Sequence, residues 1–333
     1  MTMQFLDCTL RDGAHVNGGD FGIERIKEIA AGLSSSHVDI VEIGFLKCIE
    51  YDEDISSYPG IEEANKILEG IPEDNGVKYA VMARADQFDI SHLSRRCGRV
   101  GLIRIAFYYD FLESAVEYAR KVRSKGYDFT LNLINTPGNS MEDLRKFVLY
   151  ANELEPYAVT LVDTFGVLDV DGMMQIAEMY DANLKKCIKI GLHVHENMSS
   201  AFALAQHFIR TIGKNREIIV DGSLMGMGRA PGNLCTELIC NYFNSEMGRN
   251  FGLPEILNLI SNDIMPIKKD HKWGYSPEYF LSAKYRVHRS YAEYLSDREI
   301  NLKRIDAVLS KIDHNHALKF DKEYLLQLLK GTD

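Results

Sequence analysis

Two stretches of the sequence concentrate side chains that can do chemistry. The first, LDCTLRDGAH from Leu6, carries Arg11, Asp12 and His15 close together. The second, GLHVHEN, carries His193 and His195. Residues i and i+2 of a strand point to the same face, so one divalent ion could bind both imidazoles. A carboxylate and two imidazoles with open positions suit an octahedral Mn, Mg, Co or Fe ion better than a closed structural zinc site.

Each of these residues also has a structural interpretation. A histidine pair on a strand can pack in a core, and Asp12 can cap a loop. Arg11 alone is usually a salt-bridge residue, and a lone His15 is usually a solvated loop histidine. Their joint placement at the ends of predicted strands favours the chemical interpretation.

The elements that would position these residues alternate along the chain. Eight short apolar or β-branched runs begin at Met3, Val38, Val77, Val100, Asp128, Tyr157, Ile188 and Glu217. Amphipathic helical patterns lie between them; Ile23, Ile26, Ile29, Ala30 and Leu33 share one helical face. Eight alternating units predict a (β/α)8 TIM barrel of the α/β class. A doubly wound open sheet is the rival, but no GxGxxG follows the first strand.

The pattern changes after about residue 260. Aromatic and amphipathic helical stretches follow, among them WGYSPEYFLSAKYRVHRSYAEYLSD and DKEYLLQLLKG. We therefore expect a TIM-barrel catalytic domain at residues 1–265 and a small C-terminal helical extension at 266–333.

A barrel makes a prediction about function, because catalytic groups sit at the C-terminal ends of its strands. Several polar residues fall in or just after the predicted strands, and we expect them to bind substrate: Glu42, Arg104, Asn132, Asp163 and Thr164. The loop GMGRAPGN, residues 226–233, follows the last strand. Its glycines allow close backbone approach. It is either a tight connection to the next helix or a loop over the metal, with Asn233 near the ion.

Composition excludes some classes of function. The formal net charge is −10, without a cluster of Lys and Arg, which argues against a nucleic-acid partner. No apolar run approaches the roughly 20 residues that span a bilayer, so no membrane partner is expected. The first residues indicate a strand rather than a secretory signal. Six scattered cysteines without a CxxC fit reduced thiols in a cytoplasmic protein.

At this point three motifs, in order, resemble the DRE-TIM metallolyases. LDCTLRDGAH is similar to the strand-one motif of that superfamily, GLHVHEN to its HxH and GMGRAPGN to its glycine loop. The resemblance covers roughly residues 3 to 265 and is nearest to the 4-hydroxy-2-oxoacid (4-hydroxy-2-oxovalerate type) pyruvate aldolases. The loop lacks the GER of the acyl-CoA synthases, and VNGGDF after His15 differs from the aldolases of aromatic degradation.

The resemblance implies a role for each matching residue. Asp12, His193 and His195 would hold a divalent metal, with Asn233 as a further ligand. Mn2+ is the expected ion, with Mg2+, Co2+ or Zn2+ as alternatives. Arg11 would stabilise an enolate, His15 would be the base, and Tyr275 would be a catalytic tyrosine from the C-terminal helices. The resemblance also implies a homo-oligomer and, as in some relatives, an aldehyde dehydrogenase partner.

These observations predict a class II aldolase that cleaves or forms a 4-hydroxy-2-oxoacid from a 2-oxoacid and an aldehyde. The metal and Arg11 would stabilise the pyruvate enolate, and a neutral imidazole would accept the 4-hydroxyl proton. The alternative is a Claisen-type synthase or lyase that acts on an acyl-CoA thioester, of the isopropylmalate or citramalate synthase or HMG-CoA lyase type. A non-catalytic scaffold is the third hypothesis. An amidohydrolase would carry its HxH on strand one, the reverse of the order here.

Overall fold

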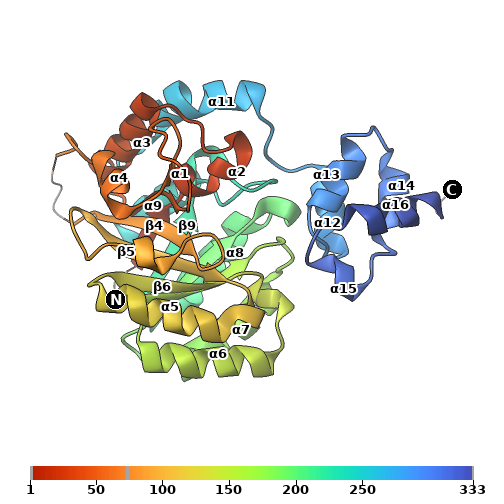
Figure 1. Cartoon of the computed structure of the whole chain (residues 1–333), viewed down its shortest axis with the longest axis horizontal. Helices are drawn as coiled ribbons and strands as arrows, with labels where there is room; N and C mark the ends of the chain where they lie inside the picture. Colours follow the sequence, from red (N-terminus) through yellow and green to blue (C-terminus); the bar gives the residue numbers. More distant parts are fainter. Residues whose placement is uncertain (1–2, 73–75, 332–333) are drawn as a thin grey trace.

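The computed structural model describes residues 3–72 and 76–331 and contains a closed barrel of eight parallel strands (Figure 1). The barrel closes because β1 pairs with β9 on one side and with β2 on the other. The order round the barrel is β1-β9-β8-β7-β6-β5-β4-β2. The strands are β1 (Met3–Asp7), β2 (Ile40–Leu46), β4 (Lys78–Arg84), β5 (Val100–Phe107), β6 (Asp128–Leu133), β7 (Ala158–Asp163), β8 (Lys189–Val194) and β9 (Ile218–Gly222).

All eight predicted runs thus form barrel strands, and the prediction of a TIM barrel is confirmed. The two-residue strand β3 (Ser57–Tyr58), which adds to β2, was not predicted. It lies in the long connection after β2, where no apolar run marks it.

Helices cover the outside of the barrel. They are α3 (Ile23–Ser35), α4 (Ile61–Lys66), α5 (Leu112–Ser124), α6 (Met141–Leu154), α7 (Val170–Asn183), α8 (Ala201–Thr211), α9 (Thr236–Met247), α10 (Leu253–Leu259) and α11 (Met265–Asp270). The shorter segments between them are η1 (Ile90–His92), η2 (Tyr109–Phe111), η3 (Thr136–Gly138), η4 (Glu196–Met198), η5 (Ile212–Lys214), η6 (Leu224–Gly226) and η7 (Ile260–Ile264). In α3, the predicted apolar face buries Ile26, Ile29 and Leu33. Among the described residues, none of the helices is both long and apolar enough to cross a membrane.

The first strand ends earlier than the sequence indicates. β1 stops at Asp7, and the next residues form two single turns, α1 (Thr9–Asp12) and α2 (Ala14–Asn17). The buried Asp7 carboxylate accepts hydrogen bonds from the Thr9 N–H at 2.8 Å and the Thr236 hydroxyl at 2.5 Å. Burial raises the pKa of Asp7 to about 6, against the effect of these bonds. Asp7 therefore fixes the turn that carries Arg11 and Asp12 over the end of the barrel.

The C-terminal helices pack around a second core. They are α12 (Pro277–Lys284), α13 (Ser290–Ser296), α14 (Leu302–Leu309), α15 (His314–Ala317) and α16 (Lys322–Lys330). The barrel core extends to Trp273, whereas the second core begins at Leu281. The domain boundary at 265/266 remains a prediction, and the outermost residues 1–2 and 332–333 of the two predicted domains lie outside the described residues.

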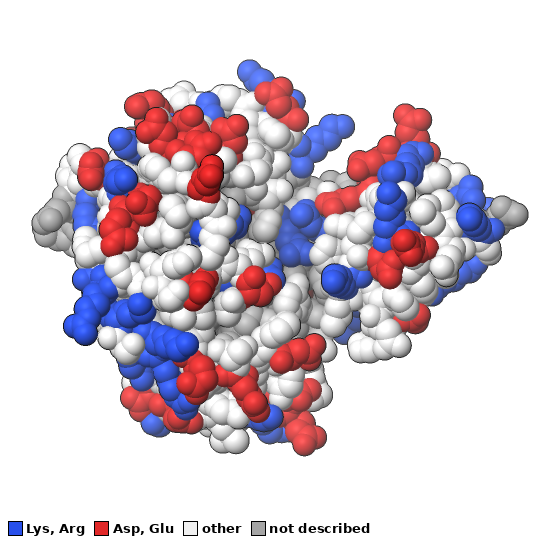
Figure 2. Space-filling model, viewed as in Figure 1, with Lys and Arg blue, Asp and Glu red and all other residues white. Residues whose placement is uncertain are grey.

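These helices lie against the loops at the C-terminal end of the barrel (Figure 1). Asn197, after β8, donates to the carbonyl of Tyr279 at 3.1 Å. Arg229, after β9, lies 2.8 Å from Nε2 of His288, and the His288 ring also packs against Phe165. In Figure 2, basic side chains gather in the hollow between the barrel and the C-terminal helices. The extension thus borders the end of the barrel where the predicted site residues lie.

Candidate metal centre and adjoining pocket

Three predicted ligands meet at the C-terminal end of the barrel. Asp12, His193 and His195 each offer a ligand atom, and these atoms lie within 4.8 Å of one another. All three side chains are buried. The two imidazole rings stand 4.9 Å apart at 80°, as expected for residues i and i+2 that face the same way.

Hydrogen bonds on the far nitrogen fix the direction of each imidazole. Nδ1 of His195 lies 2.8 Å from the carbonyl oxygen of Asp163, and Nδ1 of His193 lies 3.1 Å from the carboxylate of Asp221. Both Nε2 atoms are then left for the site. Nε2 of His195 is buried, lacks a hydrogen-bond partner and lies 4.0 Å from Asp12 Oδ2. Such outer partners orient the histidines of metal sites.

Asn233 offers a fourth atom that could bind a metal, its side-chain oxygen Oδ1. Its Nδ2 donates to Asp12 Oδ2 at 2.6 Å, while its Oδ1 is buried without a hydrogen-bond partner. A Cβ at Gly228 would lie 2.2 Å from Asn233 Nδ2 and 2.5 Å from Asp12 Oδ2, so only glycine fits there. Nε2 of His195 and Oδ1 of Asn233 are thus buried without hydrogen-bond partners beside the Asp12 carboxylate. Buried polar atoms normally have partners, so these atoms fit the ligands of a divalent cation.

A buried ion-pair chain joins Asp12 to His193. Arg11 binds Asp12 and, through Nε, Oε2 of Glu42 at 2.8 Å. Arg104 binds the same Glu42 oxygen at 2.9 Å and also binds Asp221, which contacts His193. The links run in the order Asp12, Arg11, Glu42, Arg104, Asp221, His193.

The charge balance of this chain favours a cation. Its three carboxylates and two guanidinium groups leave one net negative charge when His193 is neutral. Burial acts to raise the pKa of Asp12, but the Arg11 charge and the nearby histidines lower it well below its usual value. Burial acts likewise on Asp221, whose pKa Arg104 and His193 lower. Both carboxylates therefore stay ionised beside the imidazoles.

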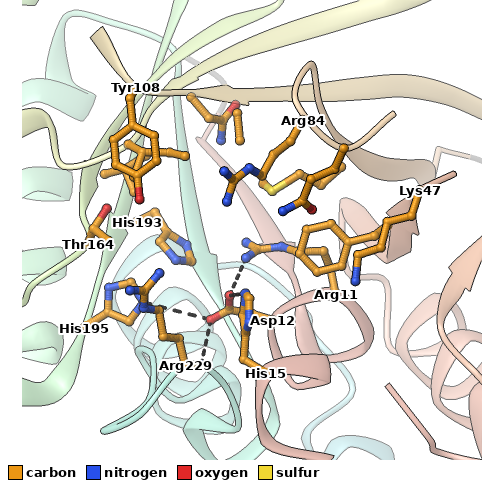
Figure 3. A pocket seen from close by; sticks show the side chains of 17 residues that line it. Arg11, Asp12, His15, Lys47, Arg84, Tyr108, Thr164, His193, His195 and Arg229 are labelled. Carbon is orange, nitrogen blue, oxygen red and sulfur yellow. Dashed lines mark hydrogen bonds and ion pairs between the residues drawn. The ribbon is translucent and has the colours of Figure 1, made fainter. Parts of the chain in front are cut away.

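A pocket of about 180 Å³ opens over the ligand group (Figure 3). Seven predicted site residues line it: Arg11, Asp12, His15, Asn132, Thr164, His193 and His195. The volume favours a substrate of few carbon atoms at the reacting end.

His15 stands at the rim of the pocket. Its side chain is 39% exposed, and Nε2 lies 3.8 Å from Asp12 Oδ1. The ring packs edge-on against Phe45. Partial loss of solvent around the ring lowers the pKa of His15, although Asp12 acts in the opposite direction. The imidazole is therefore neutral near pH 7, as a base must be.

Five predicted residues do not line the pocket; Asn233 contacts Asp12 in the ligand group, and the other four lie elsewhere. Glu42 and Arg104 lie beneath it, with at most 1% exposure, and their charges are engaged in the ion-pair chain. Asp163 accepts the N–H groups of Val167 and Leu168 at 3.0 Å, so its carboxylate closes a loop. Tyr275 is 57% exposed in the segment between α11 and α12 and does not line this pocket. The geometry gives these four no contact with a substrate there.

The sequence interpretation also missed lining residues. Lys47, Arg84, Tyr108 and Arg229 line the pocket, and Asp221 orients His193. A basic residue directly after an apolar strand was the available signal for Lys47, and an acid inside the strand IIVDG was the signal for Asp221. Neither signal stands out without knowledge of which strands lie opposite each other.

Comparison with known proteins gives consistent matches. The family model described as HMGL-like matches residues 2–256. The 4-hydroxy-2-oxovalerate aldolase 2 of Burkholderia lata is 25% identical over 79% of this chain and 78% of its own. The 4-hydroxy-2-oxovalerate aldolase 2 of Dechloromonas aromatica is 25% identical over 73% of this chain and 71% of its own.

Solved structures match the fold. The N-terminal domain of a candidate aldolase from Bacteroides vulgatus superposes with a TM-score of 0.72 at 20% identity, over 88% of this chain and 96% of that one. The HMG-CoA lyase of Brucella melitensis gives a TM-score of 0.61 at 14% identity, over 81% of this chain and 99% of that one. At these identities the likeness supports the barrel architecture alone.

Proposed function

The chain belongs to the HMGL-like family, the DRE-TIM group that its motifs predict, and from this membership we propose a metal-dependent aldolase that cleaves or forms a 4-hydroxy-2-oxoacid. The chain is an enzyme of the carbon–carbon lyase class. The observation that carries the finer proposal is the pocket itself. It places a metal-ligand group, a guanidinium and a neutral imidazole around one small cavity.

Each group has a separate task in cleavage. Bound at Asp12, His193, His195 and Asn233, a divalent ion would supply Lewis-acid stabilisation of negative charge on the 2-oxoacid. His15 accepts the proton of the C4 hydroxyl, C4–O becomes a carbonyl, and the C3–C4 electron pair passes to the enolate of pyruvate. Arg11, held by Glu42, keeps a fixed positive charge beside that enolate.

The reaction can be tested without knowing the aldehyde. Purified protein is stripped of metal and incubated with pyruvate in D2O, with Mn2+, Mg2+, Co2+ or Zn2+ added in turn. We expect metal-dependent exchange of the methyl protons, followed by NMR, with Mn2+ the most effective ion. An inactive His195→Ala variant and an active variant at an exposed position, His207→Ala on α8, are the controls. No exchange with any of the ions would contradict the proposal.

The Claisen alternative uses the same metal ligands, so it needs its own assay. Incubation with 2-oxoacids and acetyl-CoA, with detection of free thiol, separates a synthase from an aldolase. We expect no thiol release. A homo-oligomer and an aldehyde dehydrogenase partner belong to the same proposal; size-exclusion chromatography with light scattering tests the first.

A further inference from the structure

Two basic residues stand side by side at the wall of the pocket that faces the ligand histidines. Lys47 follows β2 and Arg84 ends β4, and these strands pair in parallel with Leu46 opposite Ala83. In the barrel order, β4 lies four strands from β8 in either direction. In Figure 3, Lys47 lies across the pocket from His195, and Arg84 lies between Lys47 and Tyr108. The pair therefore occupies the wall opposite the histidines.

The protein matches the charge of Arg84 but not that of Lys47. Lys47 has no carboxylate within ion-pair distance in the part of the chain that the structure describes; its ammonium lies 4.6 Å from the centre of the Phe45 ring. Arg84 binds the half-exposed Asp86 through Nε at 3.0 Å and an NH2 group at 2.6 Å. That bidentate pair fixes the guanidinium plane. Burial, followed by the Arg84 charge, lowers the pKa of Lys47.

Cations outnumber acids among the residues that line the pocket. Four of its lining residues are cations, Arg11, Lys47, Arg84 and Arg229, and one is an acid, Asp12. Arg11 and Arg229 lie after β1 and β9, on the side of the ligand group, where one carboxylate of the 2-oxoacid would bind. Arg84 ends β4, opposite β8, and Lys47 lies between it and Arg11, over the ring of Phe45 that Arg11 also approaches. The two residues thus extend the basic lining away from the ligand histidines.

We propose that Lys47 and Arg84 bind a second anionic group, a carboxylate or a phosphate, carried by the aldehyde half of the substrate. The inference rests on the proposed aldolase function and names its substrate class. The scissile C3–C4 bond then lies between the two charged ends. Cleavage yields pyruvate, once C3 takes a proton from solvent, and an aldehyde that keeps the anionic group.

The wall between the two ends limits the rest of the substrate. Phe45, Met82 and Ala106 form one apolar cluster there, and Ile134 packs against it. These side chains offer no hydrogen bonds to further hydroxyl groups. We therefore expect the carbon spacer between the aldehyde carbon and the anionic group to be short and apolar on the side that faces this cluster.

The test is a comparison of aldehydes in condensation with pyruvate. Succinic semialdehyde carries a carboxylate, glycolaldehyde phosphate carries a phosphate, and butyraldehyde and the methyl ester of succinic semialdehyde are neutral references. A charge-assisted hydrogen bond contributes roughly 1.5–3 kcal/mol, so the better anionic aldehyde should exceed the neutral ones about 10- to 100-fold in kcat/KM. Preference for the carboxylate or for the phosphate identifies the group, and either result supports the inference.

Variants separate the pair from the rest of the site. Lys47→Met and Arg84→Gln should each lower the ratio of kcat/KM for the anionic over the neutral aldehyde at least tenfold. Lys121→Met, on the exposed surface of α5, should keep the wild-type ratio. A wild-type enzyme that exchanges pyruvate protons yet prefers neutral aldehydes would overturn this inference and leave the aldolase proposal standing. Absence of pyruvate exchange would overturn both.

Discussion

The two ends of the pocket differ in how the protein treats charge. At the ligand end, Glu42, Arg104 and Asp221 are at most 1% exposed, and each charge has a partner of opposite sign. At the far end, Lys47 and Arg84 are half-buried, and Asp86 is the one carboxylate bound to them among the described residues. The charges at the ligand end are paired within the protein and leave room for a cation, whereas the far end keeps a positive charge that an anion could match.

The difference follows from the cost of burial. An unpaired charge in a dry interior is strongly unfavourable, so the ligand end must be balanced within the protein or by its ion. The side chains at the far end are partly exposed to solvent, which screens an unmatched cation at little cost. Changes at the ligand end should therefore act through metal and fold, and changes at the far end through substrate.

The largest effect should come from the carboxylate of the ligand group. Asp12→Asn keeps the shape of the side chain but removes the negative charge of the ligand. A metal site that is lost takes with it several kcal/mol of transition-state stabilisation, so aldol turnover should fall about 1,000-fold. Metal content after dialysis should fall with it, as measured by elemental analysis. Asp20→Asn, at an exposed position nearby, is the matched control. Stoichiometric Mn2+ in the Asp12 variant would show that the ligand end has been misassigned.

The next change removes the base from the rim between the two ends. His15→Ala should lower aldol cleavage roughly 100- to 10,000-fold, the usual contribution of a positioned base. Metal binding should be unchanged, because His15 is not in the ligand group. Stopped-flow or coupled pyruvate assays measure the first quantity and elemental analysis the second. Near-full turnover with metal bound would mean that another group takes the hydroxyl proton.

A smaller effect is expected from the residue that orients His193. Asp221→Asn keeps a hydrogen-bond acceptor but removes charge from both His193 and Arg104. Loss of an outer partner typically costs 10- to 100-fold in metal affinity, which competition with a chelator measures. Thr130→Val, at another buried polar position of the barrel interior, should destabilise the fold without changing metal affinity. Unchanged metal affinity in the Asp221 variant would make the ion-pair chain a purely structural feature.

The smallest effect concerns pH and the contact between the C-terminal helices and the barrel. Burial, with the charges of Arg229 and Arg289, lowers the pKa of His288 to about 4 from an ordinary 6.5. The folded state thus favours neutral His288, so its stabilising effect is complete above pH 6.5 and is lost as the pH falls toward 4. By pH 5 the loss should reach up to about 2 kcal/mol.

Urea unfolding at pH 7 and pH 5 measures this loss. His288→Gln should lose up to about 2 kcal/mol less than the wild type in that window, because glutamine does not titrate, whereas His15 and His195, whose pKa values are also lowered, act equally in both proteins. Asp12 and Asp221, whose pKa values are lowered, should stay ionised throughout and contribute no change there. An equal loss of stability in wild type and variant would assign the acid sensitivity to another group.

Particular residues show where sequence-based prediction succeeds. The spacing of His193 and His195 on one strand forces both imidazoles to one face, so their meeting with Asp12 could be predicted once the barrel was expected. The same reasoning led us to expect that Glu42 and Arg104 bind substrate, whereas both lie buried beneath the pocket with their charges paired. A polar side chain in a barrel strand can line the substrate pocket or bind a charged partner beneath it. Which of the two occurs depends on whether such a partner lies within reach.

The sequence by itself determined the barrel and the residue types of the ligand group, because strand periodicity and short-range spacing are local properties of the chain. Only the tertiary structure decided which charges are neutralised inside the protein and which remain for a substrate. That distinction depends on contacts such as Arg104 with Asp221, which lie far apart in the chain. It also depends on which strands face each other across the barrel, as β4 and β8 do.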